Sequence, residues 1–242
     1  MKVEGRNAVL ELLKTDKTID KILMQKDPDK KSPQGSLGKI FAEARKKNVR
    51  VQFVDKELLD KESGSTHHQG VIALTTDFVY AEMEDLVAQK KANGGFLILC
   101  DGIEDVHNLG SILRVAECAG ADGVIIPKTN SASVTESVIR ISAGAANFMP
   151  VAKVTSLNNT IDFLQKNGYW IYALEADGED IYQADLTGNV ALVIGGEDSG
   201  VKRLTREKCD KVLSLPLHGK VNSLNASVAL GIAAYEVAKQ RN

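Results

Sequence analysis

The hydrophobic positions near the start of the chain predict a small α/β unit. Two segments place apolar side chains at helical spacing, and three others alternate or are rich in β-branched residues, as strands are. The expected helices cover residues 5–14 and 36–48, and the expected strands cover 19–25, 49–54 and 70–76. Residues 27–35 are rich in Pro, Asp, Ser and Gly, which indicates a loop.

A second alternation of strands and helices begins at residue 94. Apolar runs predict strands at 96–100, 123–127, 151–154, 169–174, 191–195 and 212–216. Helical patterns cover 109–120, 137–144, 157–167 and a long segment from about Ser223. Such alternation predicts a mainly parallel sheet with helices on both faces. Residues 77–93 have no strand pattern and are interpreted as a linker between domains at 1–76 and 94–242.

Three of the expected helices have side chains suited to capping their first turn. Asn108 precedes the helix at 109–120 and can accept hydrogen bonds from its free backbone N–H groups. Ser133 is followed three residues later by Glu136, which is the spacing of a capping box. Ser223 takes the capping position before the last helix. These side chains predict where the helices begin.

Composition limits the class of protein. Of the 242 residues, 43% are hydrophobic and 26% are charged, which is ordinary for a globular chain and excludes a disordered one. The longest apolar runs are far shorter than the roughly 20 residues that cross a bilayer. The first residues are charged and contain no apolar signal-peptide core. We therefore expect a cytoplasmic protein with no membrane partner.

The cysteines and histidines do not suggest a metal site or a disulfide framework. The chain has three cysteines, an odd number, without a Cys-x-x-Cys pair, and its four histidines have no ligand spacing with them. We therefore expect a protein without a metal. The sequence also lacks a Gly-x-Gly-x-x-Gly or P-loop pattern, which disfavours a nucleotide-dependent oxidoreductase on a Rossmann fold.

Charge is unevenly distributed along the chain. The net charge is −2, but residues 1–50 hold 13 Lys and Arg against 7 Asp and Glu. This basic N-terminal part indicates an anionic partner. Solvated helix ends are the ordinary alternative, since runs such as Arg45-Lys46-Lys47 also occur at the ends of exposed helices.

Unusual residues follow three of the expected strands of the second block, at the edge where α/β sheets bind their ligands. They are Asn108, Gly110 and Arg114 after the first strand, Gly195, Gly196, Glu197 and Gly200 after the fifth, and Pro216, Gly219, Ser223 and Asn225 after the last. Considered separately, the three groups have ordinary interpretations as a surface ion pair, a glycine-rich turn and a helix cap.

Taken together, the three segments resemble the motifs of the SpoU (TrmH-like) ribose 2′-O-methyltransferases of the SPOUT superfamily. The family's first motif has the spacing of Asn108, Gly110 and Arg114. Its second motif is Gly-x-Glu after an apolar strand, and its third is Leu/Ile-Pro, a Gly and then Ser-Leu-Asn. These correspond to Gly195 and Glu197, and to Leu215-Pro216, Gly219 and Ser223-Leu224-Asn225.

The resemblance extends to the N-terminal part and has two departures. GRNAVLELL at 5–13 and HQGVIA at 68–73 are similar to the substrate-binding domain of the subgroup that methylates guanosine in 23S rRNA. His107 stands where the family most often has proline, and Asp198-Ser199 replaces a commoner glycine-containing sequence. Neither departure removes a residue with a proposed chemical role, but both could alter the shape of a loop at the site.

The resemblance implies features that the residue pattern alone does not give. It implies a small N-terminal RNA-binding domain, similar to ribosomal proteins, and a C-terminal SPOUT domain threaded into a deep trefoil knot, which general topology rules disfavour. It implies that S-adenosylmethionine (AdoMet) is held in the knot around Gly195, Leu215, Gly219 and Leu224. It also implies a homodimer whose active site is completed across the interface.

Methyl transfer to a ribose hydroxyl needs in-line geometry and removal of a proton from a weak acid, and fixed donors serve both needs. By resemblance, Arg114 is the central catalytic residue. Because a guanidinium is a poor base, we expect it to bind a substrate phosphate or ribose oxygen while a phosphate or water accepts the proton. Asn108 and Glu197 would orient the arginine or the sugar. Ser223 and Asn225 would contact the ribose and the cofactor.

The resemblance implies an RNA substrate, with a guanosine of 23S rRNA, free or in a ribosome assembly intermediate, as the leading expectation. RNA binding uses cations at phosphates and polar groups at bases and sugars. The phosphate candidates are Arg6, Lys14, Arg45, Lys46 and Lys47, and the base or sugar candidates are His68 and Gln69. Two alternatives stay open: a tRNA ribose methyltransferase of the same family, and a non-catalytic RNA-binding protein. The joint presence of all three motifs disfavours the second.

Overall fold

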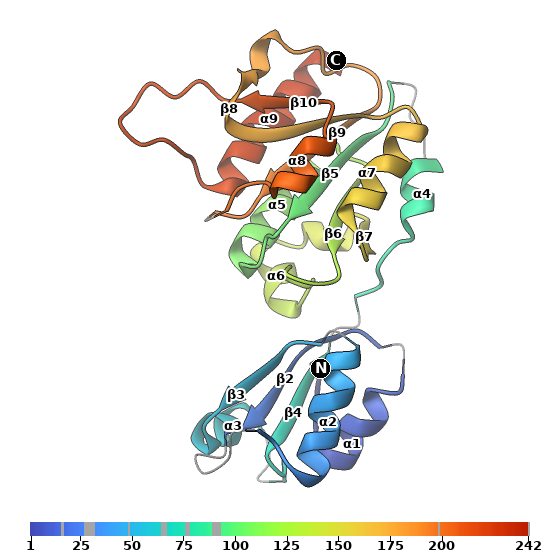
Figure 1. Ribbon diagram of the computed structural model, residues 1–242, viewed down its shortest axis with the longest axis vertical. Coiled ribbons are helices and arrows are strands. Elements are labelled where there is room, and N and C mark those ends of the chain that lie inside the picture. The colour runs from blue at the N-terminus through green and yellow to red at the C-terminus, as the bar shows by residue number, and fades with distance from the viewer. Residues whose placement is uncertain are drawn as a thin grey trace. The chain divides into compact units, whose positions relative to one another are not determined.

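The chain folds into two compact units, Met1–Val79 and Tyr80–Asn242 (Figure 1). The structure, a computed structural model, describes residues 1–15, 17–26, 32–47, 49–63, 67–75, 78–88, 93–197 and 199–241. Within these ranges, no helix has both the length and the apolar character needed to cross a membrane.

The first unit is built on a mixed sheet of four described strands. Its strands are β1 (Lys2–Glu4), β2 (Ile19–Gln25), β3 (Val51–Val54) and β4 (Val71–Thr75), and its helices are α1 (Arg6–Leu12), α2 (Gly35–Lys46) and α3 (Lys56–Glu62). The spatial order is β1-β4-β2-β3, with β2 and β3 parallel and the other pairs antiparallel. Strand β3 therefore lies at an edge of the sheet.

Alternate residues of β2 point to opposite faces of this sheet, and each face has its own core. Ile22 and Met24 pack with Ile40 under α1 and α2, whereas Leu23 packs with Leu59 of α3 on the other face. The sequence pattern did not predict α3, because Leu59 is the one buried side chain among its seven residues. A single apolar position gives no periodicity to detect.

The second unit contains a parallel sheet of six strands in the described residues, with the order β10-β8-β9-β5-β6-β7. The strands are β5 (Phe96–Asp101), β6 (Gly123–Pro127), β7 (Val151–Val154), β8 (Trp170–Asp180), β9 (Val190–Gly195) and β10 (Lys211–Ser214). The predicted mainly parallel α/β architecture is thus confirmed. Since β5, β6 and β9 are buried along their whole length, their apolar runs were strong signals.

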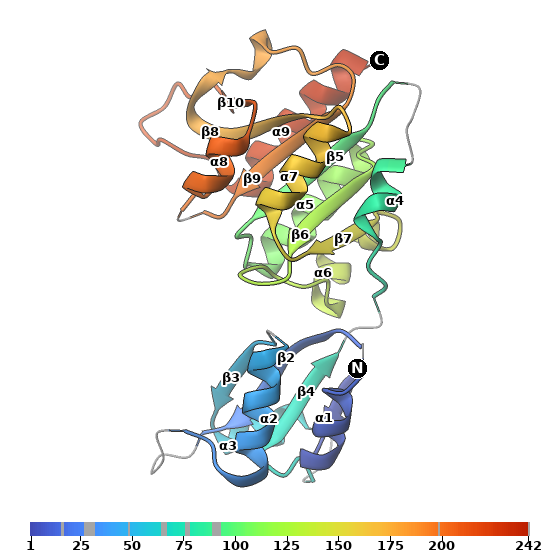
Figure 2. The same cartoon turned by 45° about the vertical axis from the view of Figure 1, so that its right-hand side comes forward.

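Helices cover both faces of the six-stranded sheet (Figure 2). They are α4 (Met83–Ala88), α5 (Val106–Cys118), α6 (Glu136–Ile141), α7 (Leu157–Lys166), α8 (Arg203–Lys208) and α9 (Ala226–Arg241), with short 3₁₀ turns η1 (Ala145–Asn147) and η2 (Ile181–Gln183). Leu86 of α4 and Ile161 of α7 join one core with Leu97, Ile125 and Val193 of the sheet. Helices α5 and α9 pack against each other on the opposite face.

The start of α5 differs from the sequence prediction. Asp105 caps this helix, and its Oδ1 accepts hydrogen bonds from the backbone N–H groups of His107 (2.8 Å) and Asn108 (2.9 Å). Asn108 therefore lies inside the first turn, and its side chain is available for other contacts. Both residues are good capping types, and the sequence alone does not fix which of them the chain uses.

Two further helix starts were predicted incorrectly. Thr135 caps α6 by accepting a hydrogen bond from the backbone N–H of Val138 (3.2 Å), in place of the predicted capping box at Ser133. Helix α9 begins at Ala226 with Asn225 directly before it, so Ser223 lies outside the helix. In each case a second polar residue close by in the sequence is the one that reaches the first turn.

Part of the predicted linker is folded. Ala81 forms a β-bridge with Ala152, and α4 packs against β7 within the second unit. Residues 77 and 89–92 of that segment, and residue 76 before it, lie outside the described residues. The domain limits 1–76 and 94–242 and the trefoil knot stay predictions.

Candidate active site

Three polar side chains from distant parts of the second unit meet at the carboxyl ends of its central strands. The Nδ2 of Asn225, at the start of α9, donates to the Oδ1 of Asn108 in α5 at 2.9 Å. The same Nδ2 donates to the Oε1 of Glu197, which follows β9. We call Asn108, Glu197 and Asn225 the polar cluster.

The orientation of Asn225 is fixed from both ends of its amide. Its Oδ1 accepts hydrogen bonds from the backbone N–H of Ser227 (3.0 Å) and from the Ser227 hydroxyl (2.7 Å), so the residue caps α9. Asn225 donates to the Oδ1 of Asn108 and to the Oε1 of Glu197. The other polar atoms of these two side chains, the Nδ2 of Asn108 and the Oε2 of Glu197, have no hydrogen-bond partner among the described residues. One donor and one acceptor are therefore free to bind a ligand.

Asp101, at the end of β5, holds the loop that carries Glu197. Its carboxylate is 2% exposed; it accepts a hydrogen bond from the backbone N–H of Lys202 and pairs with the Lys202 ammonium, each at 3.0 Å. Its main-chain oxygen accepts a hydrogen bond from the N–H of Gly196 at 3.1 Å. One residue thus binds both ends of the loop. We call Asp101 and Lys202 the loop clamp.

Two glycines, at the end of β9 and directly after it, leave the backbone bare where the turn begins. A Cβ added to Gly195 would lie 1.9 Å from the carbonyl carbon of Gly200, and one added to Gly196 would lie 2.6 Å from the oxygen of Gly102. Neither position can hold a side chain unless the backbone shifts. Gly110 has a different role: a Cβ there would lie 2.7 Å from the Cβ of Ile141, so this glycine lets α6 pack closely against α5.

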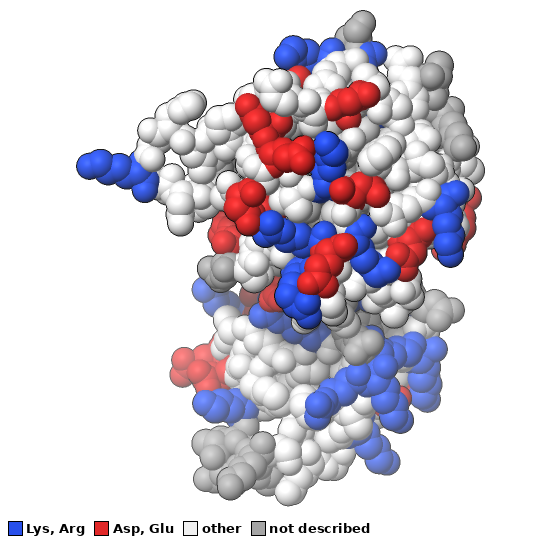
Figure 3. Space-filling model, turned by 45° about the horizontal axis from the view of Figure 1, so that its top comes forward, with Lys and Arg blue, Asp and Glu red and all other residues white. Residues whose placement is uncertain are grey.

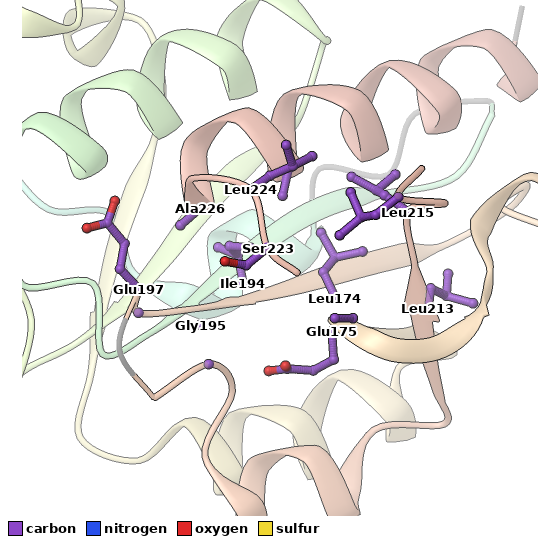
Figure 4. Close-up of a pocket in the computed structure, with 15 residues that line it drawn as sticks. Leu174, Glu175, Ile194, Gly195, Glu197, Leu213, Leu215, Ser223, Leu224 and Ala226 are labelled. Carbon is purple, nitrogen blue, oxygen red and sulfur yellow. The ribbon is translucent and has the colours of Figure 1, made fainter. Parts of the chain in front are cut away.

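A pocket of about 200 Å³ lies beside the polar cluster, between the ends of β8 and β9 and the segment before α9. Apolar side chains and bare backbone make up most of its wall, and Glu197 lies at one end (Figure 4). Its lining includes Leu174, Glu175, Ile194, Gly195, Glu197, Leu213, Leu215, Ser223 and Leu224. Of the predicted cofactor contacts, Gly195, Leu215 and Leu224 line this pocket and Gly219 does not.

Two carboxylates border this otherwise apolar space. Glu197 contributes its free Oε2, and Glu175 lies on the wall with its Oε1 accepting a hydrogen bond from the backbone N–H of Val201. Apolar walls suit a flat hydrophobic group, and carboxylates suit hydroxyl donors or a positive charge. The pocket therefore fits a ligand that combines an apolar ring with hydroxyl groups and a cationic centre.

Arg114 does not join the polar cluster. It is exposed on α5 and makes no hydrogen bond or ion pair with any residue that the structure describes. It lies six positions after Asn108, which at 3.6 residues per turn places the two side chains about 120° apart around the helix axis. Arg114 instead shares the exposed side of α5 with His107 and Cys118.

The predicted RNA contacts of the first unit fall into different environments. Arg6 is exposed and donates from Nε to the main-chain oxygen of Gln69 (2.9 Å) and from Nη1 to the Ser36 hydroxyl (3.2 Å). His68 is 3% exposed, and both ring nitrogens are engaged, with Asp60 (2.8 Å) and with the N–H of Gly70 (3.0 Å). Arg6 and Gln69 can meet a ligand at the surface, whereas His68 has a structural environment.

The predicted phosphate contacts at and just beyond the C-terminal ends of α1 and α2 are exposed but differ in their partners. Lys14 and Lys46 form ion pairs of 2.6 Å with Glu11 and Glu43, and Lys47 donates to a main-chain oxygen. Arg45 makes no ion pair within the described chain, and its guanidinium lies 5.8 Å from the ring centroid of Phe41. Among the predicted phosphate contacts, Arg45 is thus the one with neither a hydrogen bond nor an ion pair to a described residue.

Sequence reasoning missed the supporting residues of the site. Asp101, Lys202 and Glu175 hold the loop around Glu197, and none of them belongs to the three motifs. A charged residue at the end of a fully apolar strand was the available signal for Asp101. Asp198 lies outside the described residues, and Ser199 is exposed. In the described segments, no group of three or more His, Cys, Asp or Glu side chains is arranged to hold a metal ion.

Two family models match the chain and together span nearly all of it. The model of the SpoU rRNA methylase family matches residues 95–235, and the model for RNA 2′-O ribose methyltransferase substrate binding matches residues 2–81. The chain belongs to the SpoU family. It is an RNA methyltransferase of this family, and the polar cluster and the pocket lie in its SpoU methylase part.

Relatives of the same length agree with this assignment. A Staphylococcus saprophyticus protein provisionally named as a TrmH family tRNA/rRNA methyltransferase is 44% identical, over 99% of this chain and 96% of its own. YacO of Bacillus subtilis, provisionally named in the same way, is 40% identical over the same shares. The solved SpoU methyltransferase AviRb of Streptomyces viridochromogenes, in complex with AdoMet, shares the fold. Its TM-score is 0.63 at 20% identity, covering 100% of this chain and 90% of that one.

Proposed function

We propose that this SpoU protein transfers a methyl group from AdoMet to a ribose 2′-hydroxyl of RNA, at a guanosine of 23S rRNA. The observation that carries the proposal is the polar cluster, with its free donor and free acceptor, at the end of an apolar pocket. The choice of 23S rRNA is supported by the match to the SpoU rRNA methylase model at residues 95–235 and by the sequence resemblance to the guanosine subgroup. A cytoplasmic location stays a prediction.

The pocket supports AdoMet as the methyl donor. Leu174, Leu215 and Leu224 supply apolar wall for an adenine ring, and the bare backbone at Gly195 allows close approach. The Glu175 carboxylate can accept hydrogen bonds from ribose hydroxyls and attract a positive charge. AdoMet, when bound, supplies an electrophilic methyl group on a cationic sulfur.

The protein's own residues position the ribose. The Nδ2 of Asn108 donates to a sugar oxygen, and the Oε2 of Glu197 accepts from a sugar hydroxyl. Asn225 keeps both in place because its amide bridges them and is itself fixed to the start of α9. Ser223 lines the pocket and contacts the ribose and the cofactor. Holding the hydroxyl in line accounts for much of the rate, since positioning is worth several orders of magnitude.

Arg114 binds a phosphate or ribose oxygen of the substrate and stabilises negative charge that develops on the attacking oxygen, while a phosphate or water takes the proton. Its exposed position on α5, outside the polar cluster, supports a site completed by a second subunit. Helix α9, which packs beside α5, exposes Val228, Ile232 and Tyr235 at spacings of four and three residues. An apolar stripe of this kind on a surface helix suits burial in a homodimer.

The reaction is tested with labelled AdoMet and two RNAs, undermethylated 23S rRNA and bulk tRNA. We expect one alkali-resistant 2′-O-methyl guanosine in the rRNA, lost in Arg114→Ala and kept in the matched variant Arg203→Ala, whose arginine pairs with Glu207 on exposed α8. Label in tRNA alone would show that the protein is a tRNA ribose methyltransferase and not an rRNA methyltransferase. RNA binding without label in either RNA would favour the non-catalytic alternative.

The shared site is tested by mixing two inactive variants, Arg114→Ala and Asn225→Ala. If Arg114 acts across the interface, a mixed dimer contains one site with both residues intact, and mixing restores part of the activity. If each subunit uses its own Arg114, every site in the mixture carries a defect and activity stays absent. Sedimentation of Tyr235→Glu, which we expect to be monomeric, checks the interface itself.

A further inference from the structure

An exposed aromatic ring lies at the edge of the first unit's sheet. Phe53, on the edge strand β3, is 44% exposed. Its ring centroid lies 5.6 Å from that of Phe41 on α2, with the two planes tilted by 47°. The guanidinium of Arg45, one turn further along α2, lies 5.8 Å from the Phe41 centroid. We call Phe53, Phe41 and Arg45 the aromatic row.

The ring of Phe53 is held in place without being buried. Val51, two residues earlier on the same side of β3, packs against the core under α2, whereas Phe53 contacts Phe41 of α2 and stays exposed. A single exposed phenylalanine is common and needs no explanation. A ring that a neighbouring ring already holds in place is better suited to binding than a freely rotating one. Little further conformational entropy is lost when another flat group stacks on it.

The charges near the aromatic row favour an anionic partner. Arg45 and Arg50 are exposed and form no ion pair with any described residue. In the space-filling view, Lys and Arg gather along the right-hand side of the first unit, with few acidic side chains beside them, whereas an acidic group lies on its left (Figure 3). Flat rings next to unpaired cations are the combination that binds single-stranded nucleic acid, where bases stack and phosphates are neutralised.

We propose that Phe53 is a stacking platform for one unpaired base of the RNA, with Arg45 at a flanking phosphate. The inference rests on the proposed function and extends it. It specifies that the substrate presents a single-stranded base to the first unit, apart from the nucleotide that is methylated. Regular duplex RNA keeps its base faces stacked inside the helix, so it would not satisfy this site.

The test compares three variants of the full-length protein. Phe53→Ala removes the platform, Phe53→Trp keeps a stacking ring, and Leu58→Ala removes a side chain of similar exposure, 40%, from α3 on the other face. The probes are a short single-stranded RNA containing one 2-aminopurine, whose fluorescence is quenched by stacking, and a regular RNA duplex. Affinity for AdoMet, measured by calorimetry, checks that the second unit is unaffected.

For Phe53→Ala we expect the Kd of the single-stranded probe to rise about 5- to 150-fold, the range found when a base–aromatic stack is removed. Phe53→Trp retains affinity and quenching, and the Kd of Leu58→Ala stays within about twofold of the wild-type value. None of these three substitutions changes the affinity for the duplex. A fourth variant, Arg45→Ala, reduces the magnitude of the slope of log K against log salt by about 0.7, as loss of one phosphate contact on a single strand does.

If Phe53→Ala binds the single-stranded probe as tightly as the wild type does, the platform is wrong. It is also wrong if the variant loses affinity for the duplex and for the single strand to the same extent. This result is separable from the methylation assay. If wild-type protein methylates RNA but does not use Phe53, the proposed function stands and the platform is wrong. If Phe53 binds the probe but no RNA is methylated, the platform stands and the proposed function is wrong.

Discussion

The loop clamp makes Asp101→Asn an informative substitution. The change removes one negative charge from a carboxylate that is 2% exposed and keeps a side chain of the same shape. The amide oxygen can still accept the hydrogen bond from the backbone N–H of Lys202, and the main-chain bond to Gly196 is untouched. What is lost is the ion pair with the Lys202 ammonium and the stronger hydrogen bonding of a charged acceptor.

The size of the effect follows from these contacts. Removing one partner of a fully buried ion pair costs about 3–5 kcal/mol, because the other charge is left without compensation. Here the Lys202 side chain is 48% exposed, so water solvates the ammonium that is left behind. We therefore expect a loss of only about 1–2 kcal/mol, between the net contribution of a neutral hydrogen bond and that of a hydrogen bond to a charged group. For a unit of this size, that loss lowers Tm by roughly 2–8 °C.

Two assays separate stability from positioning. Thermal or urea unfolding gives the change in free energy, and calorimetry gives the affinity for AdoMet. Because the clamp holds the loop beside the pocket, a loosened loop must be ordered again when the ligand binds. Affinity for AdoMet then falls by up to about 5- to 30-fold, the equivalent of the same 1–2 kcal/mol. Asp177→Asn is the matched control, since Asp177 pairs with Arg206 (2.9 Å) at the exposed surface, and we expect no measurable change.

Equal stability and equal affinity in Asp101→Asn and wild type would refute the clamp. A loss of stability without any loss of AdoMet affinity would show that Asp101 supports the fold but does not position the loop. Lys202→Gln gives an independent check, because it removes the same ion pair from the exposed partner.

Three further substitutions or reactions test other parts of the site. Asn225→Ala removes the cap of α9, so urea unfolding should show a free energy of unfolding lower by about 0.5–2 kcal/mol. Turnover should also fall, and unchanged turnover would contradict the role of the polar cluster. Gly195→Ala puts a methyl group 1.9 Å from the backbone of Gly200, and calorimetry should detect no AdoMet binding. Partial burial raises the pKa of the Cys209 thiol to about 12, so at pH 8 the thiol is neutral and a disulfide reagent should label exposed Cys118 much faster than half-buried Cys209. Equal labelling rates in the native protein would contradict that burial.

The sequence predicted the second unit's sheet well because its central strands are long, fully apolar runs. Phe96–Asp101 and Val190–Gly195 are buried at every residue, so each appears as an unbroken apolar run before a polar loop. Helices α3 and α8 were missed because each buries a single side chain, Leu59 in one and Thr205 in the other. A short helix that contributes one contact to the core leaves almost no periodic pattern.

The candidate site was predictable in its members but not in its contacts. The motif resemblance selected Asn108, Glu197 and Asn225, which the structure brings into hydrogen-bond contact. It did not select Glu175, whose partner is 26 residues away, or Asp101, whose partner Lys202 is 101 residues away. Such pairings depend on the complete fold, which places the ends of β5, β8 and β9 next to one another.

The bare backbone at the turn after β9 has a consequence for selective inhibition. The pocket presents main-chain atoms at Gly195, and peptide groups are the same whatever the side chains around them become. A substitution at Gly195 that blocked an inhibitor there would also drive a Cβ into the Gly200 backbone. An inhibitor that hydrogen-bonds to these peptide groups would therefore leave the protein few routes to resistance by point mutation.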